Sequence, residues 1–341
     1  MSDITGEGST SAEHVGSSKG LGGKSSRGHG KRFWWVYVLI ILVVAVVVVV
    51  PCVILVAVPR MAQKKLDKAT LSIDGIVVTN TQTNSIHMAI NSTITTDGST
   101  HATVDGFEGT MYLADVDPPL AFATIDFPET TADAIQTVNV SQEVPISDSN
   151  AFTTFNAHLI RSESVNVLVR GDTKVHVRGI SRAYGVTFRK TVALTGMNGF
   201  KGISVTDPHV NANQNDNFNA TTHIPNPSAL TLEIGNTTFH TYFNGTDIGT
   251  SYIQNMVLRP GPNDFFIWAD IDQAVVLQAL TQHPWCDNGT LPVQLAGRSV
   301  TNHGQPLPYF ADALAATNQS VEIAIGQAVE DDIGLPLTCS S

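Results

Sequence analysis

The chain has 341 residues and a formal net charge of −11 at pH 7, and only 14% of its residues are charged. This acidic balance makes nucleic acid an unexpected partner, because a phosphate backbone attracts basic surfaces. Sparse charge combined with plentiful Thr, Asn, Ser and Val favours β-structure on a glycosylated, non-cytosolic surface over a charged cytosolic helical protein.

The first 32 residues are rich in Gly and Ser and contain almost nothing that could form a core. They hold five basic and three acidic residues, which leaves this segment slightly positive. Such a composition predicts a disordered tail, 1–32, whose basic residues suit acidic lipid headgroups on the cytosolic side.

Residues 33–58 read FWWVYVLIILVVAVVVVVPCVILVAV and include no charged residue. As a helix this run would be about 39 Å long, which exceeds the ~30 Å hydrocarbon core of a bilayer. Trp34, Trp35 and Tyr37 form an aromatic belt at one interface, and the kink that Pro51 introduces is tolerated in lipid. We interpret the run as a transmembrane helix, since a signal peptide usually has a shorter apolar region and a small-residue cleavage site.

The orientation of this helix depends on glycosylation patterns, because the basic residues on its two sides nearly balance. Asn-x-Ser/Thr occurs seven times, always after the helix. The simplest interpretation places the N-terminus in the cytosol and residues 59–341 in a lumen or outside the cell. The predicted glycosylation sites are Asn91, Asn139, Asn219, Asn236, Asn244, Asn288 and Asn318.

Three cysteines are present, and Cys52 lies within the membrane helix. Cys286 and Cys339 are the two that remain, and an even count in an oxidising compartment favours a disulfide between them. Two free thiols are the alternative. The bridge would stabilise the fold by roughly 4 kcal/mol on the loop-entropy estimate.

After a polar, basic stalk over 59–70, the hydrophobic pattern changes to a period of two. Strands are expected at 71–78, 85–94, 109–114, 120–125, 135–140, 165–169, 174–177, 186–188 and 191–194. Between them, 147–160 places Phe152, Phe155 and Leu159 on one face of a short helix, with a Ser or Asp available as its N-cap. These elements define a first luminal β-sandwich domain, 71–206.

A similar order of elements begins again around Ile203, and the strand at 230–239 repeats the character of 86–94. Strands are expected at 230–239, 256–262, 265–271, 291–298 and 321–325, with a helix over 273–281 capped by Asp272. The Asn- and Pro-rich segment 207–226 is the predicted linker, and 227–341 the second sandwich. The expected fold is therefore mostly β: one N-terminal transmembrane helix followed by two tandem Ig-like β-sandwich domains, each with one short helix.

Catalytic and metal-binding signatures are missing from the sequence. G-x-S-x-G, H-E-x-x-H and C-x-x-C do not occur, so we expect no enzyme and no cofactor. His87 and His176 lie within strand patterns and are expected to be surface residues. The pairs Asp115/Asp117 and Asp270/Asp272 could bind calcium through hard oxygens, but turn and cap roles are favoured.

The helix faces are the apolar feature with functional potential. Core packing against a sheet is their default use, whereas a groove for acyl chains would use the same side chains packed less completely. The sequence does not separate these two uses. The candidate groove residues are Phe152, Phe155 and Leu159 in the first copy and Val275, Leu277 and Leu280, together with Val276, in the second.

One anchor, a short stalk and strands reading like Asn84–Ile94 and Asn226–Ile234 resemble the late-embryogenesis-abundant type 2 domain, the sandwich of water-stress and hypersensitive-response proteins. The whole arrangement looks most like fungal vacuolar-membrane proteins that carry tandem luminal copies. The resemblance implies no enzymatic activity, and it implies a sandwich whose helix can leave an apolar groove for lipid. One branch of that family is linked to the control of autophagy at the vacuole.

Two functions from different classes follow from these observations. In the first, luminal tandem sandwiches of a single-pass endomembrane protein bind or transfer lipid. In the second, the sandwiches are a glycosylated structural spacer while the cytosolic tail recruits partners. Deleting residues 1–30 separates them, because only the second function depends on the tail.

Overall fold

The computed structural model describes residues 34–212, 215–336 and 338–340, so the predicted tail 1–32 lies outside the described residues. The chain divides into two compact units, one ending at Leu55 and the other beginning at Val56. We describe them separately.

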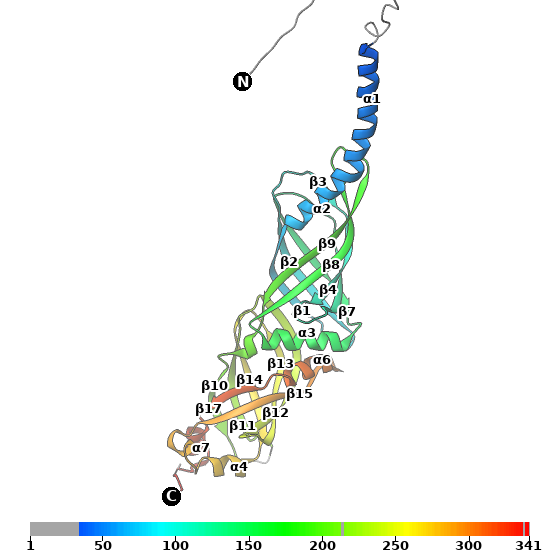
Figure 1. Ribbon diagram of the computed structural model, residues 1–341. Helices are drawn as coiled ribbons and strands as arrows, with labels where there is room; N and C mark the ends of the chain where they lie inside the picture. The colour runs from blue at the N-terminus through cyan, green and yellow to red at the C-terminus, as the bar shows by residue number, and fades with distance from the viewer. Residues whose placement is uncertain (1–33, 213–214, 337, 341) are drawn as a thin grey trace, which may run out of the picture. The chain divides into compact units, whose positions relative to one another are not determined.

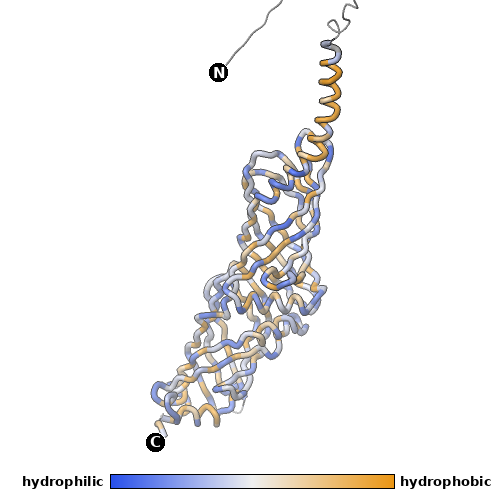
Figure 2. The backbone as a smooth tube through the Cα atoms, in the orientation of Figure 1, coloured by the Kyte–Doolittle hydropathy of each residue, from blue (hydrophilic) through white to orange (hydrophobic). Residues whose placement is uncertain are grey.

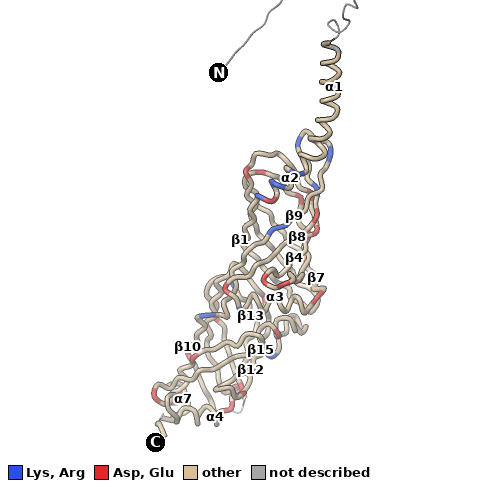
Figure 3. The backbone as a smooth tube through the Cα atoms, viewed as in Figure 1, with Lys and Arg blue, Asp and Glu red and all other residues tan. Residues whose placement is uncertain are grey.

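The first unit contains α1 (Trp34–Cys52), which runs into a π-helical segment, η2 (Val53–Ala57). α1 is apolar along its length (Figure 2) and carries no charged residue (Figure 3). Pro51 lies at its end, where the missing N–H disturbs the regular hydrogen-bond ladder and π-type irregularities are common. Among the described residues, one helical stretch, Tyr37–Lys68, is long and apolar enough to span a membrane, as the sequence predicts.

The second unit is mostly β and is built from two sheets (Figure 1). The smaller has the order β5-β4-β8-β3-β6, with β9 paired to β8; the larger has the order β10-β11-β14-β13-β12-β1-β2-β7, with β15 joining β12 to β17 and β16. The predicted fold class, an apolar N-terminal helix followed by sandwich-like sheets, is confirmed. The strands are β1 (Thr70–Thr79), β2 (Ser85–Thr95), β3 (Ala102–Val104), β4 (Phe107–Leu113), β5 (Leu120–Phe127), β6 (Thr130–Thr131), β7 (Ile135–Pro145), β8 (Ser164–Val177), β9 (Ala183–Thr195), β10 (Ser204–Val210), β11 (Phe218–Asn226), β12 (Leu230–Phe243), β13 (Thr246–Leu258), β14 (Gly261–Ile271), β15 (Leu291–Asn302), β16 (Gln305–Pro306) and β17 (Gln319–Ile323).

The expected stalk is a helix, α2 (Val58–Lys68), that is attached to the β body. Gln63 and Thr187 of β9 exchange two hydrogen bonds, of 2.9 and 3.0 Å. Lys190, also on β9, donates to the carbonyl oxygens of Asp67 and Ala69 at 2.8 and 2.6 Å. These contacts make α2 an integral part of the second unit.

The two halves share one sheet. β1 pairs in parallel with β12, with Ile76 opposite Leu230 and Val78 opposite Leu232. Because this pairing joins the first strand of one predicted sandwich to the first strand of the other, the larger sheet runs across the predicted boundary.

The segment 207–226, expected to be a linker, contributes strands instead: it holds the end of β10 and all of β11. Its Asn and Pro content suggests a loop, but Phe218, Ala220, Thr222 and Ile224 alternate and are all buried. Burial of one face therefore outweighs the poor strand propensity of the intervening residues.

Among the described residues, the first half has the one α-helix expected, whereas the second half has four instead of one. These helices are α3 (Ser149–Arg161), α4 (Gln273–Ala279), α5 (Trp285–Asn288), α6 (Pro308–Ala315) and α7 (Ile325–Ile333), with a 3-10 turn, η3 (Asn198–Phe200). α6 lies beside α3 (Figure 1), and Arg161 donates to the carbonyl oxygen of Ala316 at 2.8 Å. On its other side α6 packs closely on β15, where a Cβ added to Gly297 would lie 2.6 Å from the Cβ of Leu314.

Candidate functional site

α3 positions the first group of predicted residues. Asp148 caps the helix by accepting a 2.9 Å hydrogen bond from the backbone N–H of Ala151, which fixes where the helix begins. From that start, Phe152, Phe155 and Leu159 all point inward and are buried. Phe155 stacks on Phe122 of β5 with ring centroids 4.0 Å apart and planes 7° from parallel. α3 is thereby held against the smaller sheet.

A cavity of about 70 Å³ lies beneath α3. The three predicted α3 residues line it together, as their helical spacing suggests. Asn156 of α3 and residues of both sheets complete its wall. Sequence analysis did not single them out as a site, because alternation marks the strand residues only as core. They are Leu71, Ile73, Ile76, Val78, Ile86, Met88, Ile90, Ser92, Met111, Phe122, Phe127, Asn156, Val167, Val169, Val192, Leu194, Leu230 and Leu232.

The polar residues that line this cavity use their side-chain donors in hydrogen bonds to backbone carbonyl oxygens of the protein. Ser92 donates to the carbonyl oxygen of Val138 at 2.9 Å, and Asn156 donates to that of Phe152 at 2.8 Å. Nearly everything else on the wall is hydrocarbon. A cavity of this character favours an apolar occupant over water, which needs two or more polar partners.

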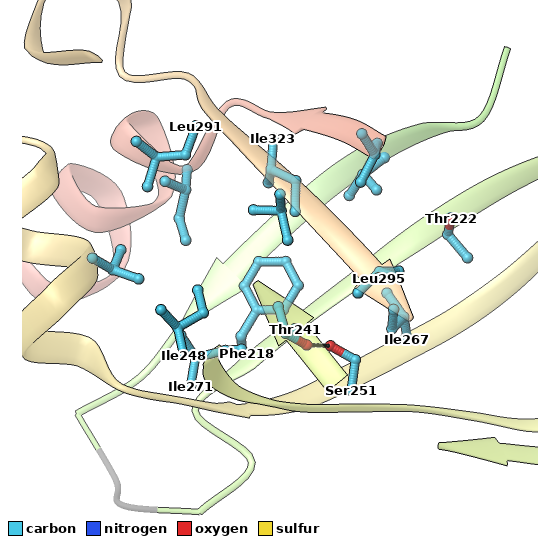
Figure 4. Close-up of a pocket in the computed structure, with 15 residues that line it drawn as sticks. Phe218, Thr222, Thr241, Ile248, Ser251, Ile267, Ile271, Leu291, Leu295 and Ile323 are labelled. Carbon is cyan, nitrogen blue, oxygen red and sulfur yellow. Dashed lines mark hydrogen bonds between the residues drawn. The ribbon is translucent and has the colours of Figure 1, made fainter. Parts of the chain in front are cut away.

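A second cavity, of about 40 Å³, occupies the other half of the unit (Figure 4). Thr241 and Ser251 share a 2.7 Å hydrogen bond at its wall, so these hydroxyls are also paired internally. Its other lining residues are Val205, Phe218, Thr222, Ile248, Ile267, Ile271, Val276, Leu291, Val293, Leu295, Val321, Ile323 and Ile325.

Of the second-copy groove candidates, Val276 of α4 lines this cavity. Leu280 is buried, and Val275 and Leu277 are half-buried against the core, but these three are not among the lining residues. α4 has seven residues, so a single turn of it faces the interior. The structure therefore brings the α3 candidates together in one site and does not bring the α4 candidates together in the other.

The structure places Cys286 and Cys339 in a disulfide, with Cα atoms 5.3 Å apart. His283 and Asp287 adjoin it, and their ring and carboxylate are 3.0 Å apart. Within the described residues these four form the group whose side chains are close enough to share a metal ion. Because the two sulfurs are bonded to each other, they are not available as thiolate ligands.

Several of the remaining candidate polar residues have structural partners. Asp115 accepts from the backbone and side chain of Asn166, both at 2.7 Å, and Asp272 caps α4. His176 pairs with Asp105 at 2.9 Å on the exposed face of the smaller sheet. Of the seven sequon asparagines, Asn219 is half-buried and the other six are exposed.

Three titratable groups have pKa values that their hydrogen bonds or burial shift. The Lys65 ammonium donates to Asp97 and, with Ser99, lowers the pKa of that carboxyl to about 2. Burial lowers the pKa of Lys190, whose ammonium donates to the backbone beside α2. Burial raises the pKa of Tyr309, whose hydroxyl donates to the carbonyl oxygen of Gln82 at 2.9 Å. None of these three groups is among the lining residues of either cavity.

One family model matches part of the chain. Residues 120–241 match the family described as "Protein of unknown function (DUF3712)". The matched segment runs from β5 through α3 to β12 and thus includes the helix above the larger cavity. No curated protein matches the sequence.

Three of the solved structures that resemble the chain do so at low identity and low TM-score. Red sea bream transglutaminase is 11% identical over 77% of this chain and 33% of its own length, with a TM-score of 0.24. A bacterial adhesin from Mobiluncus mulieris is 7% identical over 79% and 84%, with a TM-score of 0.21. The Salmonella enterica SafA pilin in complex with the SafB chaperone is 10% identical over 70% and 94%, with a TM-score of 0.18. The chain thus spans a third of the transglutaminase it matches.

Proposed function

We propose that this is a non-enzymatic, single-pass membrane protein whose β unit binds or transfers lipid. The observation that carries the proposal is the apolar cavity between α3 and the two sheets. Its walls offer hydrocarbon and stacked phenyl rings, and its polar groups already have partners. An acyl chain is the membrane component whose surface matches such walls.

The closed cavity limits what can bind. Pockets for drug-sized ligands are roughly 300–1,000 Å³, whereas this one is about 70 Å³. A lipid tail therefore requires α3 to move away from the sheets. α3 is the natural moving part because it is capped at its own start and covers the cavity as a single element.

The proposed setting follows the sequence. We place the N-terminus in the cytosol and the β unit in the lumen of an endomembrane compartment, with the seven sequons as glycosylation sites. Six of those asparagines are exposed, which is the arrangement that attached glycans need. The resemblance to late-embryogenesis-abundant type 2 domains suggests the fungal vacuole and a link to autophagy.

Mass spectrometry of lipids retained by a secreted fragment, residues 59–341, tests the proposal. The fragment keeps α2, whose hydrogen bonds to β9 belong to the fold. Val78 and Val77 are adjacent on β1 and face opposite sides: Val78 is 5% exposed and lines the cavity, whereas Val77 is 39% exposed. We expect Val78→Phe to fill the cavity and lose lipid, and the matched control Val77→Phe to keep it. A wild-type fragment free of lipid contradicts the proposal.

A second candidate, a luminal spacer with a partner-recruiting tail, is favoured by the parallel β1–β12 pairing, which fastens both halves into one sheet. Deleting residues 1–30 from the full chain discriminates between the two. A spacer and adaptor loses its cellular function with the tail, whereas lipid binding by the β unit survives the deletion.

A further inference from the structure

A row of aromatic side chains crosses the outer face of the larger sheet. We call Tyr252, Phe266 and Trp268 the aromatic row; Tyr252 comes from β13 and the other two from β14. Tyr252 and Trp268 have ring centroids 5.7 Å apart and planes within 19°, and Phe266 and Trp268 are 6.3 Å apart within 28°. Phe266 is 60% exposed. Tyr252 and Trp268 are half-buried, so the row is an exposed phenyl ring stacked beside two partly accessible rings, and an apolar platform of this kind marks a candidate binding surface.

A glycosylation sequon lies beside this row. In the pairing of β11 with β14, Asn219 is directly opposite Trp268, and Thr221 is directly opposite Phe266. Directly paired residues share a face, and their Cβ atoms lie about 4.5–5.5 Å apart. The sequon Asn219-Ala220-Thr221 and the aromatic row are therefore one continuous patch. Asn219 is also the one half-buried asparagine among the seven sequons.

The chemistry of the patch suits a sugar. One face of a pyranose ring presents C–H groups, which stack on an aromatic face, while its hydroxyls need polar partners at the ring edge. The edge of the aromatic row supplies them: Tyr252 donates to Asp270 at 3.3 Å, and Arg298 donates to the neighbouring Thr250 at 3.0 Å. Carboxylate, guanidinium and hydroxyl groups thus border a flat apolar platform.

We propose that the aromatic row is the docking platform for the N-linked glycan on Asn219. The occupant is carbohydrate carried by this same chain, and the first sugars fold back across Trp268 and Phe266. Attachment one strand away gives the sugar a high local concentration, so a stacking interaction too weak to hold a free saccharide suffices. The proposal rests on the luminal placement of the β unit.

The test uses the full chain, produced in a eukaryotic host, solubilised in detergent and kept native. Timed endoglycosidase digestion followed by site-resolved mass spectrometry gives the release rate at each sequon. We expect the Asn219 glycan to be released about tenfold more slowly than the glycan on exposed Asn318, which is the scale that one aromatic stack supports. Phe266→Thr and Trp268→Thr should bring the two rates together. Ile135→Thr, which removes another exposed apolar side chain on β7, should leave the ratio unchanged.

Phe266 protrudes into solvent, so its substitution does not disturb the core. Equal release rates at Asn219 and Asn318 in the wild type, or a slow Asn219 rate that Phe266→Thr leaves unchanged, overturn the platform. A bare Asn219 on a chain glycosylated elsewhere overturns it as well, while leaving the luminal placement intact. A chain with no glycan at any sequon overturns both.

Discussion

Replacing Phe155 by Ala probes the cavity beneath α3 most directly. Phe155 is 8% exposed and stacks face to face on Phe122, so truncation removes a buried phenyl ring together with its stacking contact on Phe122. A ring burying roughly 150 Å² at about 25 cal/mol per Å² accounts for about 4 kcal/mol. Measured Phe→Ala losses of about 3–5 kcal/mol in protein cores agree with this value.

The assay is urea unfolding of the 59–341 fragment, with and without a long-chain fatty acid. We expect the free energy of unfolding to fall by about 3–5 kcal/mol with an unchanged m-value. Added fatty acid should raise the unfolding midpoint of Phe155→Ala more than that of the wild type, because the enlarged cavity accepts an acyl chain and ligand binding stabilises the folded state. Phe266→Ala makes the same truncation at a 60% exposed site and should cost under about 1 kcal/mol.

Two results would refute this reasoning. A loss below about 1 kcal/mol for Phe155→Ala would mean that the ring does not hold α3 against the sheets. A decrease of the full 3–5 kcal/mol predicted for Phe155→Ala, roughly the Phe→Ala range, with no response to fatty acid would mean that α3 completes a core and that the cavity takes no lipid.

Three further predictions concern the fold. Gly297→Val should destabilise the fragment by about 1–3 kcal/mol, because its Cβ would meet Leu314 and the Ala311 carbonyl oxygen, whereas Gly185→Val, with open space around it, should have little effect on urea midpoints. Lys65→Met should return the pKa of Asp97 from about 2 toward about 3.9, which carboxyl-carbon NMR can measure. Since folding lowers this pKa, the Lys65–Asp97 ion pair stabilises the fold above about pH 4, and the stabilisation is lost as pH falls toward 2. An Asp97 pKa that the substitution leaves unchanged would count against the pair. Cys339→Ser should cost roughly 4 kcal/mol in urea unfolding, for a loop closed across a separation of 53 residues, and a reductant should then have no further effect on the variant.

Local structure was predictable where local chemistry determines it. Period-two alternation located β1, β2 and β12, and Asp272 marked the start of α4. For α3 the sequence offered a Ser or Asp as N-cap, and the structure selects Asp148. The α3 groove residues were predictable for the same reason, since a 3.6-residue period puts Phe152, Phe155 and Leu159 on one side.

α6 escaped prediction because it lacks those signals. Its N-cap position is Leu307, with no side-chain cap, and most of its residues are buried, so the sequence shows no amphipathic stripe. Long-range pairing was also beyond a single sequence. Nothing local to Ile76 or Leu230 indicates that they lie opposite each other, and this contact joins one sheet of the first half to the sheet of the second half. The cavity walls, drawn from both sheets, depend on that same pairing.

The β1–β12 pairing also means that β1 is synthesised well before the strand it pairs with. A ribosome makes β1 about 150 residues before β12, which at roughly 5–20 residues per second is an interval of about 8–30 s. During that time β1 can pair with β2, but its other edge has no partner, and an open strand edge invites pairing with another nascent chain. A pause in translation, or a chaperone bound to the nascent chain, would therefore matter most for this protein in the seconds before residue 232 emerges.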